Sequence, residues 1–224
     1  MKFIYSLIIS FLLFAFITTN LPLAFSYDDG RYIMDSDMWP VHPDGHYALI
    51  PSFMGINIGR VYLGKTGDST CPVTVLEQDF TSERGIPLKF SVPGDPYYGE
   101  IFTGKPVDIE FVRKPDCVES SKWLIFVDNV IQKSCVGIGG PENYPGMQIL
   151  NGTFLIRRNG GGVRYIYKFV FCVNGSTTNC SDIGYYKIGE MGGRLILNAK
   201  QASSFLFVEN YSYKDKDGII KSVA

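Results

Sequence analysis

Short apolar runs separated by turn residues make up most of the chain after residue 26. The runs are rich in Val, Ile, Tyr and Phe, and clusters of Gly, Pro, Asn and Asp lie between them, a pattern typical of strands joined by turns. No window of about a dozen residues in this part keeps apolar residues at helical spacing. We therefore expect an all-β protein of twelve strands, beginning near Tyr47, Ile58, Val73, Leu88, Val107, Trp123, Cys135, Phe154, Val163, Ile183, Arg194 and Phe205.

The strands show the alternation of half-buried sheets. Apolar and polar residues alternate over 107–111, and a row of aromatic residues alternates with Ile166, Lys168 and Val170 over 165–171. This places Val170 on an outer face. The chain beyond residue 26 divides into three stretches of about 65 residues with four strands each, which indicates a pseudo-threefold β-trefoil. Periodicity alone also allows a two-sheet sandwich.

The first 26 residues have the features of a secretory signal peptide. Lys2 precedes an apolar stretch from Leu7 to Ile17, and Ala24 and Ser26, on either side of Phe25, provide small side chains for cleavage after Ser26. An apolar stretch of roughly ten residues is short for a membrane span, which needs about 20. We therefore expect residues 1–26 to be removed, leaving a single domain at 27–224 that is not anchored in a membrane.

Charge and histidine content argue against several classes of function. Without residues 1–26 the chain has 22 acidic and 20 basic residues, mixed in sign along its length, so no basic stripe suggests nucleic-acid binding. The two histidines, His42 and His46, share one turn-rich segment, which favours neither a metal site nor a catalytic base. The glycine run 160–162 suits a hairpin turn better than a phosphate-binding loop. We expect no enzyme activity, no cofactor and no metal.

Cysteines and glycosylation sequons fit an oxidising, secretory destination. Four cysteines alone already permit three disulfide connectivities, and an odd fifth leaves one thiol. The cysteines are Cys71, Cys117, Cys135, Cys172 and Cys180. Four sequons, of which we expect only some to be used, start at Asn151, Asn174, Asn179 and Asn210.

Three strings of residues resemble the plant Kunitz (soybean trypsin inhibitor-like) protease inhibitors. Residues 70–75 and 85–88 resemble the family's Cys-Pro-x-Thr-Val and Gly-x-Pro-Leu strands, and residues 167–184 resemble its Tyr-Lys-Leu-Val-Phe-Cys strand with the short disulfide loop after it. The resemblance covers about residues 30–208. The family's amino-terminal signature is matched by Asp35, Pro40, Val41, Gly45, Tyr47, Leu49, Ile50 and Pro51.

The resemblance implies a fold, a disulfide pattern and a partner. It implies a β-trefoil with the bridges Cys71–Cys117 and Cys172–Cys180, which leaves Cys135 as a thiol. We expect Cys135 to act as a small buried apolar residue, and the alternative is an intermolecular bridge or a reactive thiol. The resemblance further implies that the protein is a monomer and that its partner is a protease, most often a serine protease.

The resemblance also implies that an exposed loop between the fourth and fifth strands enters a protease as a substrate would. The matching loop spans about residues 93–101, with the site at Pro96, Tyr97, Tyr98, Gly99 and Glu100. A trypsin-like pocket requires Lys or Arg, whereas an aromatic side chain suits a chymotrypsin-like or subtilisin-like pocket. We therefore expect a preference other than trypsin, with the scissile bond left open among Tyr97, Tyr98 and Gly99.

One departure from the family concerns the support of this loop. The family's bracing Asn, whose side-chain amide reaches the loop backbone, is replaced by Pro43, which has no such donor. A loop without that brace should be looser, unless Pro93 and Pro96 stiffen it from within.

Together these features predict a secreted protease inhibitor of plant defence, extracellular (apoplastic) or vacuolar. The alternative is a non-inhibitory Kunitz-type storage or defence protein, or a binder of another enzyme, such as a cysteine protease or an amylase, through a different loop. The candidate for such a second loop is Gly139–Met147, which contains Pro141, Tyr144 and Pro145.

Overall fold

The computed structural model describes residues 30–43, 45–53, 56–57, 59–79, 81, 85–94, 99–159, 165–175, 179–187 and 192–210. The expected signal peptide and its cleavage point lie outside these residues. The described part consists of strands and turns with one short 3₁₀ turn, and it holds no helix long and apolar enough to cross a membrane. The elements are β1 (Tyr47–Phe53), β2 (Ile56–Asn57), β3 (Gly59–Gly64), β4 (Thr74–Asp79), β5 (Leu88–Ser91), β6 (Pro106–Phe111), β7 (Trp123–Asp128), β8 (Lys133–Ile138), η1 (Pro141–Asn143), β9 (Gln148–Leu150), β10 (Gly152–Arg158), β11 (Tyr167–Val173), β12 (Cys180–Tyr186), β13 (Gly193–Leu197) and β14 (Phe205–Glu209).

The all-β prediction is confirmed, and the expected strands all have counterparts. Two short strands, β2 and β9, are additional, because two- and three-residue pairings carry no periodic signal. The strand expected near Val163 begins at Tyr167, and residues 160–164 lie outside the described part. The hairpin turn expected at 160–162 falls in this gap; on either side of it β10 and β11 pair from Gly152 with Val173 to Arg158 with Tyr167.

Six strands close into a barrel. β1, β5, β6, β10, β11 and β14 pair in that order, and the pairing of β14 with β1 completes the ring. The ring is antiparallel throughout. A two-sheet sandwich would leave its sheets open, so the closed ring excludes that alternative.

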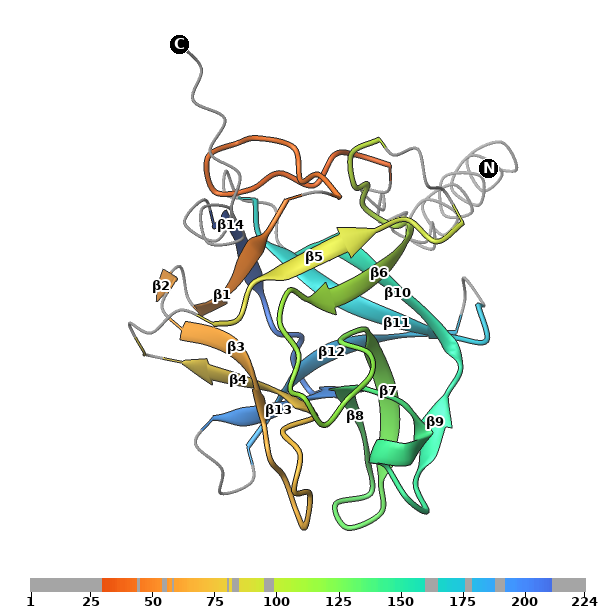
Figure 1. Cartoon of the computed structure of the whole chain (residues 1–224). Coiled ribbons are helices and arrows are strands. Elements are labelled where there is room, and N and C mark those ends of the chain that lie inside the picture. Colours follow the sequence, from red (N-terminus) through yellow and green to blue (C-terminus); the bar gives the residue numbers. More distant parts are fainter. Residues whose placement is uncertain are drawn as a thin grey trace, which may run out of the picture.

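Three hairpins lie at one end of the barrel (Figure 1). They are β3–β4, β7–β8 and β12–β13, and their inner strands β4, β8 and β13 each pair with the other two. Each third of the chain therefore supplies two barrel strands and one hairpin. This arrangement is the β-trefoil that the sequence predicts.

Aromatic side chains fill the core between the barrel and the hairpins. The Trp123 ring lies between 5.2 and 6.1 Å from the ring centroids of Phe111, Phe154 and Phe169. Interlocked rings of this size bury large apolar areas and fix each other's orientation. The scaffold on which the loops stand is therefore tightly packed.

The outer face of β11 is not exposed as a half-buried alternation would suggest. Val170 lies on that face and is nevertheless buried there together with Leu155 and Cys172, and Cys180 packs against this small cluster. The disulfide of Cys172 covers this part of the outer barrel face. Local alternation cannot show that a neighbouring segment covers the second face of a strand.

Candidate functional site

The candidate loop joins β5 to β6 at the end of the barrel opposite the three hairpins, where the amino-terminal segment also lies (Figure 1). Val92, at its start, packs on the core, and Pro93 and Gly94 are exposed. Pro96, Tyr97 and Tyr98 lie outside the described residues, so the register of the scissile bond stays a prediction. On the far side of this gap Gly99 is exposed and Glu100 is half-buried.

The outgoing leg of the loop, residues 101–103, forms an antiparallel pair with residues 31–33 of the amino-terminal segment, which is the stretch 30–43 before β1. The Ile33 N–H donates to the Ile101 carbonyl at 2.9 Å, and the Thr103 N–H donates to the Arg31 carbonyl at 2.8 Å. Between these bonds lie Tyr32 and its partner residue 102, whose rings are 4.9 Å apart. This leg is therefore held as a strand before it enters β6.

The same leg is fixed by a second line of contacts. The Ile101 N–H donates to the Val41 carbonyl at 3.0 Å, and the Val41 N–H donates to the Ile33 carbonyl at 2.7 Å. All three side chains are buried in the core. The main chains of Ile33 and Val41 thus hold Ile101 by hydrogen bonds, an arrangement that we call the clamp. Their buried side chains anchor this clamp in the core.

Thr103 adds a side-chain bond to this clamp. It is fully buried, and its Oγ1 accepts the Arg31 N–H at 3.1 Å. The Gly30 N–H donates to the Thr103 carbonyl at 2.8 Å. The sequence analysis missed this role of Thr103. Burial alternates along this leg, with Ile101 and Thr103 buried and Phe102 half-buried, but the residue types do not, so the sequence carried no strand signal here.

Pro43 lies in a turn that closes on Tyr47. The Tyr47 hydroxyl accepts the His42 N–H at 3.0 Å, and the Gly45 N–H donates to the His42 carbonyl at 3.0 Å. A Cβ at Gly45 would lie 2.3 Å from the Tyr47 hydroxyl, so only glycine fits there. The turn fixes the chain that follows Val41. Pro43 has no side-chain donor for the loop, and the loop is supported instead by the main chain of Val41.

Both disulfides have the implied pairing. Cys71–Cys117 joins the approach to β4 with the β6–β7 connection, and Cys172–Cys180 joins β11 to β12. Cys135, on β8, is fully buried and remains a thiol, with its Sγ 3.7 Å from the Lys133 carbonyl. It is thus placed as the small buried residue that we expected.

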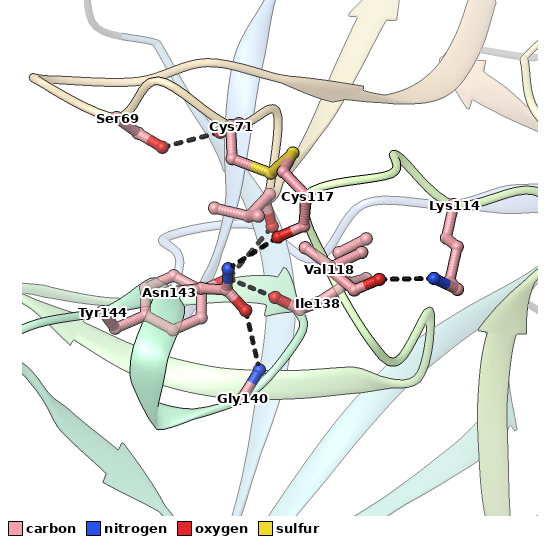
Figure 2. The surroundings of a disulfide bond; sticks show 10 residues. Ser69, Cys71, Lys114, Cys117, Val118, Ile138, Gly140, Asn143 and Tyr144 are labelled. Atoms are coloured by element: carbon pink, nitrogen blue, oxygen red, sulfur yellow. Dashed lines mark hydrogen bonds between the residues drawn. A yellow bond between two sulfur atoms is a disulfide. The ribbon is translucent and has the colours of Figure 1, made fainter.

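Tyr144 lies next to Asn143, whose Nδ2 donates to the Cys117 carbonyl of the first disulfide at 3.3 Å (Figure 2). Its hydroxyl lies 2.8 Å from the Ile138 carbonyl and 3.1 Å from the Val73 carbonyl, and its ring stacks on Phe126 at 4.2 Å. Burial raises the pKa of the Tyr144 phenol above its ordinary value. The residue is buried, so the loop 139–147 does not present this aromatic side chain to a partner. The suggestion of a second binding loop there loses its main residue.

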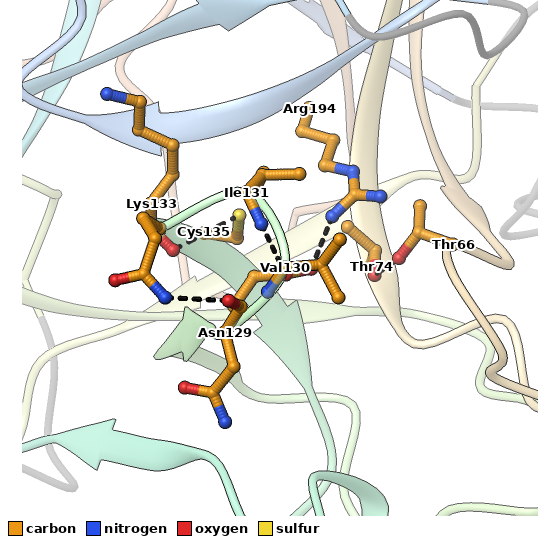
Figure 3. Close-up of polar contacts among 10 residues, drawn as sticks. Thr66, Thr74, Asn129, Val130, Ile131, Lys133, Cys135 and Arg194 are labelled. Atoms are coloured by element: carbon orange, nitrogen blue, oxygen red, sulfur yellow. Dashed lines mark hydrogen bonds and ion pairs between the residues drawn. The ribbon is translucent and has the colours of Figure 1, made fainter.

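A buried ion pair links two of the hairpins. Arg194 of β13 reaches toward the β7–β8 turn (Figure 3) and donates from Nη1 to Asp128 Oδ2 at 2.6 Å. Burial by itself would raise the pKa of Asp128, but N–H bonds from Ile131 and Val130 and the Arg194 guanidinium hold that pKa below its ordinary value. The pair fixes a hairpin on the side of the protein away from the loop.

The remaining candidate residues lie as follows. Asn151, Asn174 and Asn179 are exposed, whereas Asn210 is buried and its N–H donates to the His46 carbonyl at 2.7 Å. The use of the sequons stays a prediction. Within the described ranges no group of His, Cys, Asp and Glu side chains could hold a metal ion.

A doubly bridged β-trefoil with a clamped, exposed loop is the architecture of a binding protein that presents a peptide segment to a partner. The profile of the legume Kunitz family, described as "Trypsin and protease inhibitor", matches residues 33–209. The chain therefore belongs to this family of protease inhibitors, whose members are inhibitors and not enzymes.

Three relatives illustrate the similarity. A Kunitz-type trypsin inhibitor-like 2 protein of Pisum sativum is 50% identical over 93% of this chain and 94% of its own length. The subtilisin inhibitor CLSI-II of Canavalia lineata is 43% identical over 87% of this chain and 99% of its own length. A crystal structure of a Kunitz-type trypsin inhibitor from Cicer arietinum superposes with a TM-score of 0.74 at 49% identity, over 80% of this chain and 99% of that chain.

Proposed function

We propose that this protein inhibits serine endopeptidases of chymotrypsin-like or subtilisin-like preference by inserting the loop 93–101 into their active sites. Membership of a family of protease inhibitors supports the general activity. The loop has no Lys or Arg between Val92 and Gly104, so it lacks the charge that a trypsin-like pocket binds. Tyr97 and Tyr98 supply aromatic side chains instead, and a related protein is named as a subtilisin inhibitor.

The observation that carries the mechanism is the clamp on the outgoing leg. Ile101 is bonded to both Ile33 and Val41, and Thr103 to Arg31. A segment already held in its bound shape loses little conformational entropy when it docks. If a protease cuts the loop, the clamp keeps the new end close to its former partner, so rejoining competes with release of the product.

The experiment is a titration of the purified, oxidised protein against chymotrypsin, subtilisin, trypsin and papain. We expect tight, stoichiometric inhibition of chymotrypsin or subtilisin and weak inhibition of trypsin. Tyr97→Ala and Tyr98→Ala should each be tested, together with the double variant. The matched control is Tyr186→Ala, which removes a half-exposed tyrosine from β12, on the hairpin side of the molecule.

The outcomes separate the possible functions. The Tyr97 and Tyr98 double variant should lose at least about tenfold in inhibition constant, as expected for a pocket-filling residue, while Tyr186→Ala should not change it. Equal inhibition by the double variant would remove the loop from the site. A lack of inhibition of all four enzymes would favour the storage or defence alternative, and inhibition of papain alone would indicate a cysteine protease as the partner.

The site of slow cleavage gives the register. Mass spectrometry of the protein after incubation with a stoichiometric amount of the inhibited protease should show a single cut after Tyr97 or Tyr98. A cut elsewhere in the chain would contradict the proposed insertion.

We also propose that the protein is secreted, with a mature chain that begins at Tyr27. The apolar segment after Lys2 and the two disulfides support a secretory route. Amino-terminal sequencing and peptide-N-glycosidase treatment of protein from plant tissue test this. A start at Met1, with no mass shift on deglycosylation, would contradict it.

A further inference from the structure

Two large apolar side chains stand on a turn of the amino-terminal segment. The turn 35–39 joins the residues that clamp the loop, and Met34 and Pro40 form an antiparallel bridge at its base. Met38 is 66% exposed and Trp39 is 65% exposed. Exposed Trp and Met side chains are frequent in contact surfaces, and Trp is among the residues that dominate binding energies.

The turn is rigid, so these side chains are held in place. Asp35 is buried, and its Oδ1 accepts the N–H groups of both Asp37 and Trp39 at 2.9 Å. The Asp35 N–H donates to the Trp39 carbonyl at 2.8 Å, and the Ser36 N–H donates to the Phe207 carbonyl of β14 at 2.8 Å. A contact surface that is already ordered loses little entropy on binding.

The strand register places this turn on the side of a small sheet to which the loop residues Glu100 and Gly99 also lead. Residues 31, 32 and 33 pair with residues 103, 102 and 101 in antiparallel order. The direction from 31 to 33 leads to the turn, and the direction from 103 to 101 leads toward the residues of the candidate site. Both therefore extend from the same end of one small sheet, at one end of the barrel (Figure 1).

The size of protein interfaces argues that the loop does not act alone. Stable complexes bury about 800 Å² on each partner and use about 20–30 residues a side. The loop from 93 to 101 supplies far fewer residues than this. A protease seated on the loop must find further contacts on neighbouring segments, and the turn 35–39 is joined to the loop through main-chain hydrogen bonds.

We propose that Met38 and Trp39 form a second contact surface for the protease that the loop inhibits, outside its substrate-binding cleft. This inference rests on the proposed function. The partner surface that fits is an apolar patch on the rim of the cleft, because both side chains are apolar over most of their exposed area. Contact there would slow dissociation of the complex and distinguish between proteases with similar pockets.

The test compares inhibition constants for wild type, Trp39→Ala, Met38→Gly and Val130→Ala against the protease that wild type inhibits best. Glycine is chosen at position 38 because Met38 has a φ of +66°, which glycine adopts without strain. Val130 is the matched control, since it is 84% exposed on the β7–β8 turn, on the hairpin side of the protein. Circular dichroism of each variant confirms that the turn substitutions leave the fold intact.

We expect Trp39→Ala to raise the inhibition constant at least about tenfold, mainly through faster dissociation, and Met38→Gly to raise it about threefold or more. Val130→Ala should leave it unchanged. Inhibition constants within twofold of wild type for both turn variants would overturn the inference while leaving the proposed function intact. Inhibition by none of the proteins, wild type included, would mean that the proposed function itself has failed.

The two tryptophans provide a second, independent readout. Trp39 is exposed, whereas Trp123 is buried in the core. In protein labelled with 5-fluorotryptophan, addition of unlabelled protease should shift the fluorine resonance of Trp39 and leave that of Trp123 in place. An unshifted Trp39 resonance in a saturated complex would overturn the inference. So would concentration-dependent dimerisation that Trp39→Ala abolishes without changing inhibition, since that would make a second copy of the chain the partner.

Discussion

Thr103 offers a direct test of whether the clamp stiffens the loop. The substitution Thr103→Val keeps a β-branched side chain of similar shape in a buried position and removes the hydroxyl that accepts the Arg31 N–H at 3.1 Å. The main-chain bond from the Thr103 N–H to the Arg31 carbonyl is retained. The change therefore weakens the pairing of the leg without deleting it.

The expected magnitude follows from the two contacts that the hydroxyl makes with Arg31, the N–H that it accepts at 3.1 Å and the bond that it donates to the carbonyl at 3.3 Å. Removing one partner of a buried hydrogen bond costs about 1–3 kcal/mol, and we expect about 1–2 kcal/mol here because the main-chain pairing persists. A change of one or two kcal/mol is a factor of about 5–30 in an equilibrium. The leg should open that much more often, so the inhibition constant should rise by up to this factor and the loop should be cut faster.

Three measurements check this, namely the inhibition constant, the cleavage rate at stoichiometric protease, and the hydrogen exchange of the Ile101 and Thr103 amides. The matched control is Thr74→Val on β4, on the hairpin side of the protein, which removes a buried hydroxyl bonded to the Thr66 hydroxyl at 2.7 Å; Figure 3 labels both residues.

Thr74→Val should lower the free energy of unfolding by a similar amount without changing inhibition. The reasoning is refuted if Thr103→Val speeds the exchange of these amides and yet leaves inhibition and cleavage at wild-type values. In that case the stiffness of the leg does not limit the activity of the loop.

Other consequences concern the scaffold. Asp128→Asn should lower the free energy of unfolding by about 3 kcal/mol at neutral pH, because it breaks a buried pair. Since the folded pKa of Asp128 lies below its ordinary value, the stability that wild type has over the variant should be present above about pH 4 and shrink as the pH falls through the folded pKa. Thermal melts of both proteins from pH 7 to pH 2 measure this stability difference. A difference that stays constant over this range would contradict the prediction. Replacing Cys71 and Cys117 by Ser should lower the free energy of unfolding, measured in urea, by about 4 kcal/mol, since this bridge spans 46 residues. The bridge between β11 and β12 spans only 8 residues, so opening it should cost less. Equal losses from the two bridges would count against the chain-entropy account. Cys135 should react with a thiol reagent only after denaturation, with one thiol per chain; rapid reaction of the native protein would show that β8 is accessible.

The fold could be predicted from sequence because its signals are local and repeated. Alternation over 107–111 placed Val107, Ile109 and Phe111 on the buried face, as the structure shows. The chain closes its barrel by pairing β14 with β1, residues far apart in sequence. That closure was inferred from the need to bury one face of every strand and from family resemblance, and no single residue signals it.

The support of the loop could not be predicted in the same way. The sequence reveals the missing side-chain donor at Pro43, because the residue type alone shows it. The clamp consists of main-chain bonds from Ile33 and Val41, and every residue type offers such groups. Only the path of the chain determines which backbone atoms meet, so this part of the site became apparent from the structure.

The strands form two closed circuits, one around the barrel and one among the three inner hairpin strands, and these circuits limit aggregation of the folded protein at high concentration. Exposed strand edges recruit other chains into continuous sheets. Among the strands that the structure describes, single-partner edges are confined to β2, β3 and β9, and two of these have three residues or fewer. Concentrated solutions of the folded protein therefore offer few templates for amyloid-like growth.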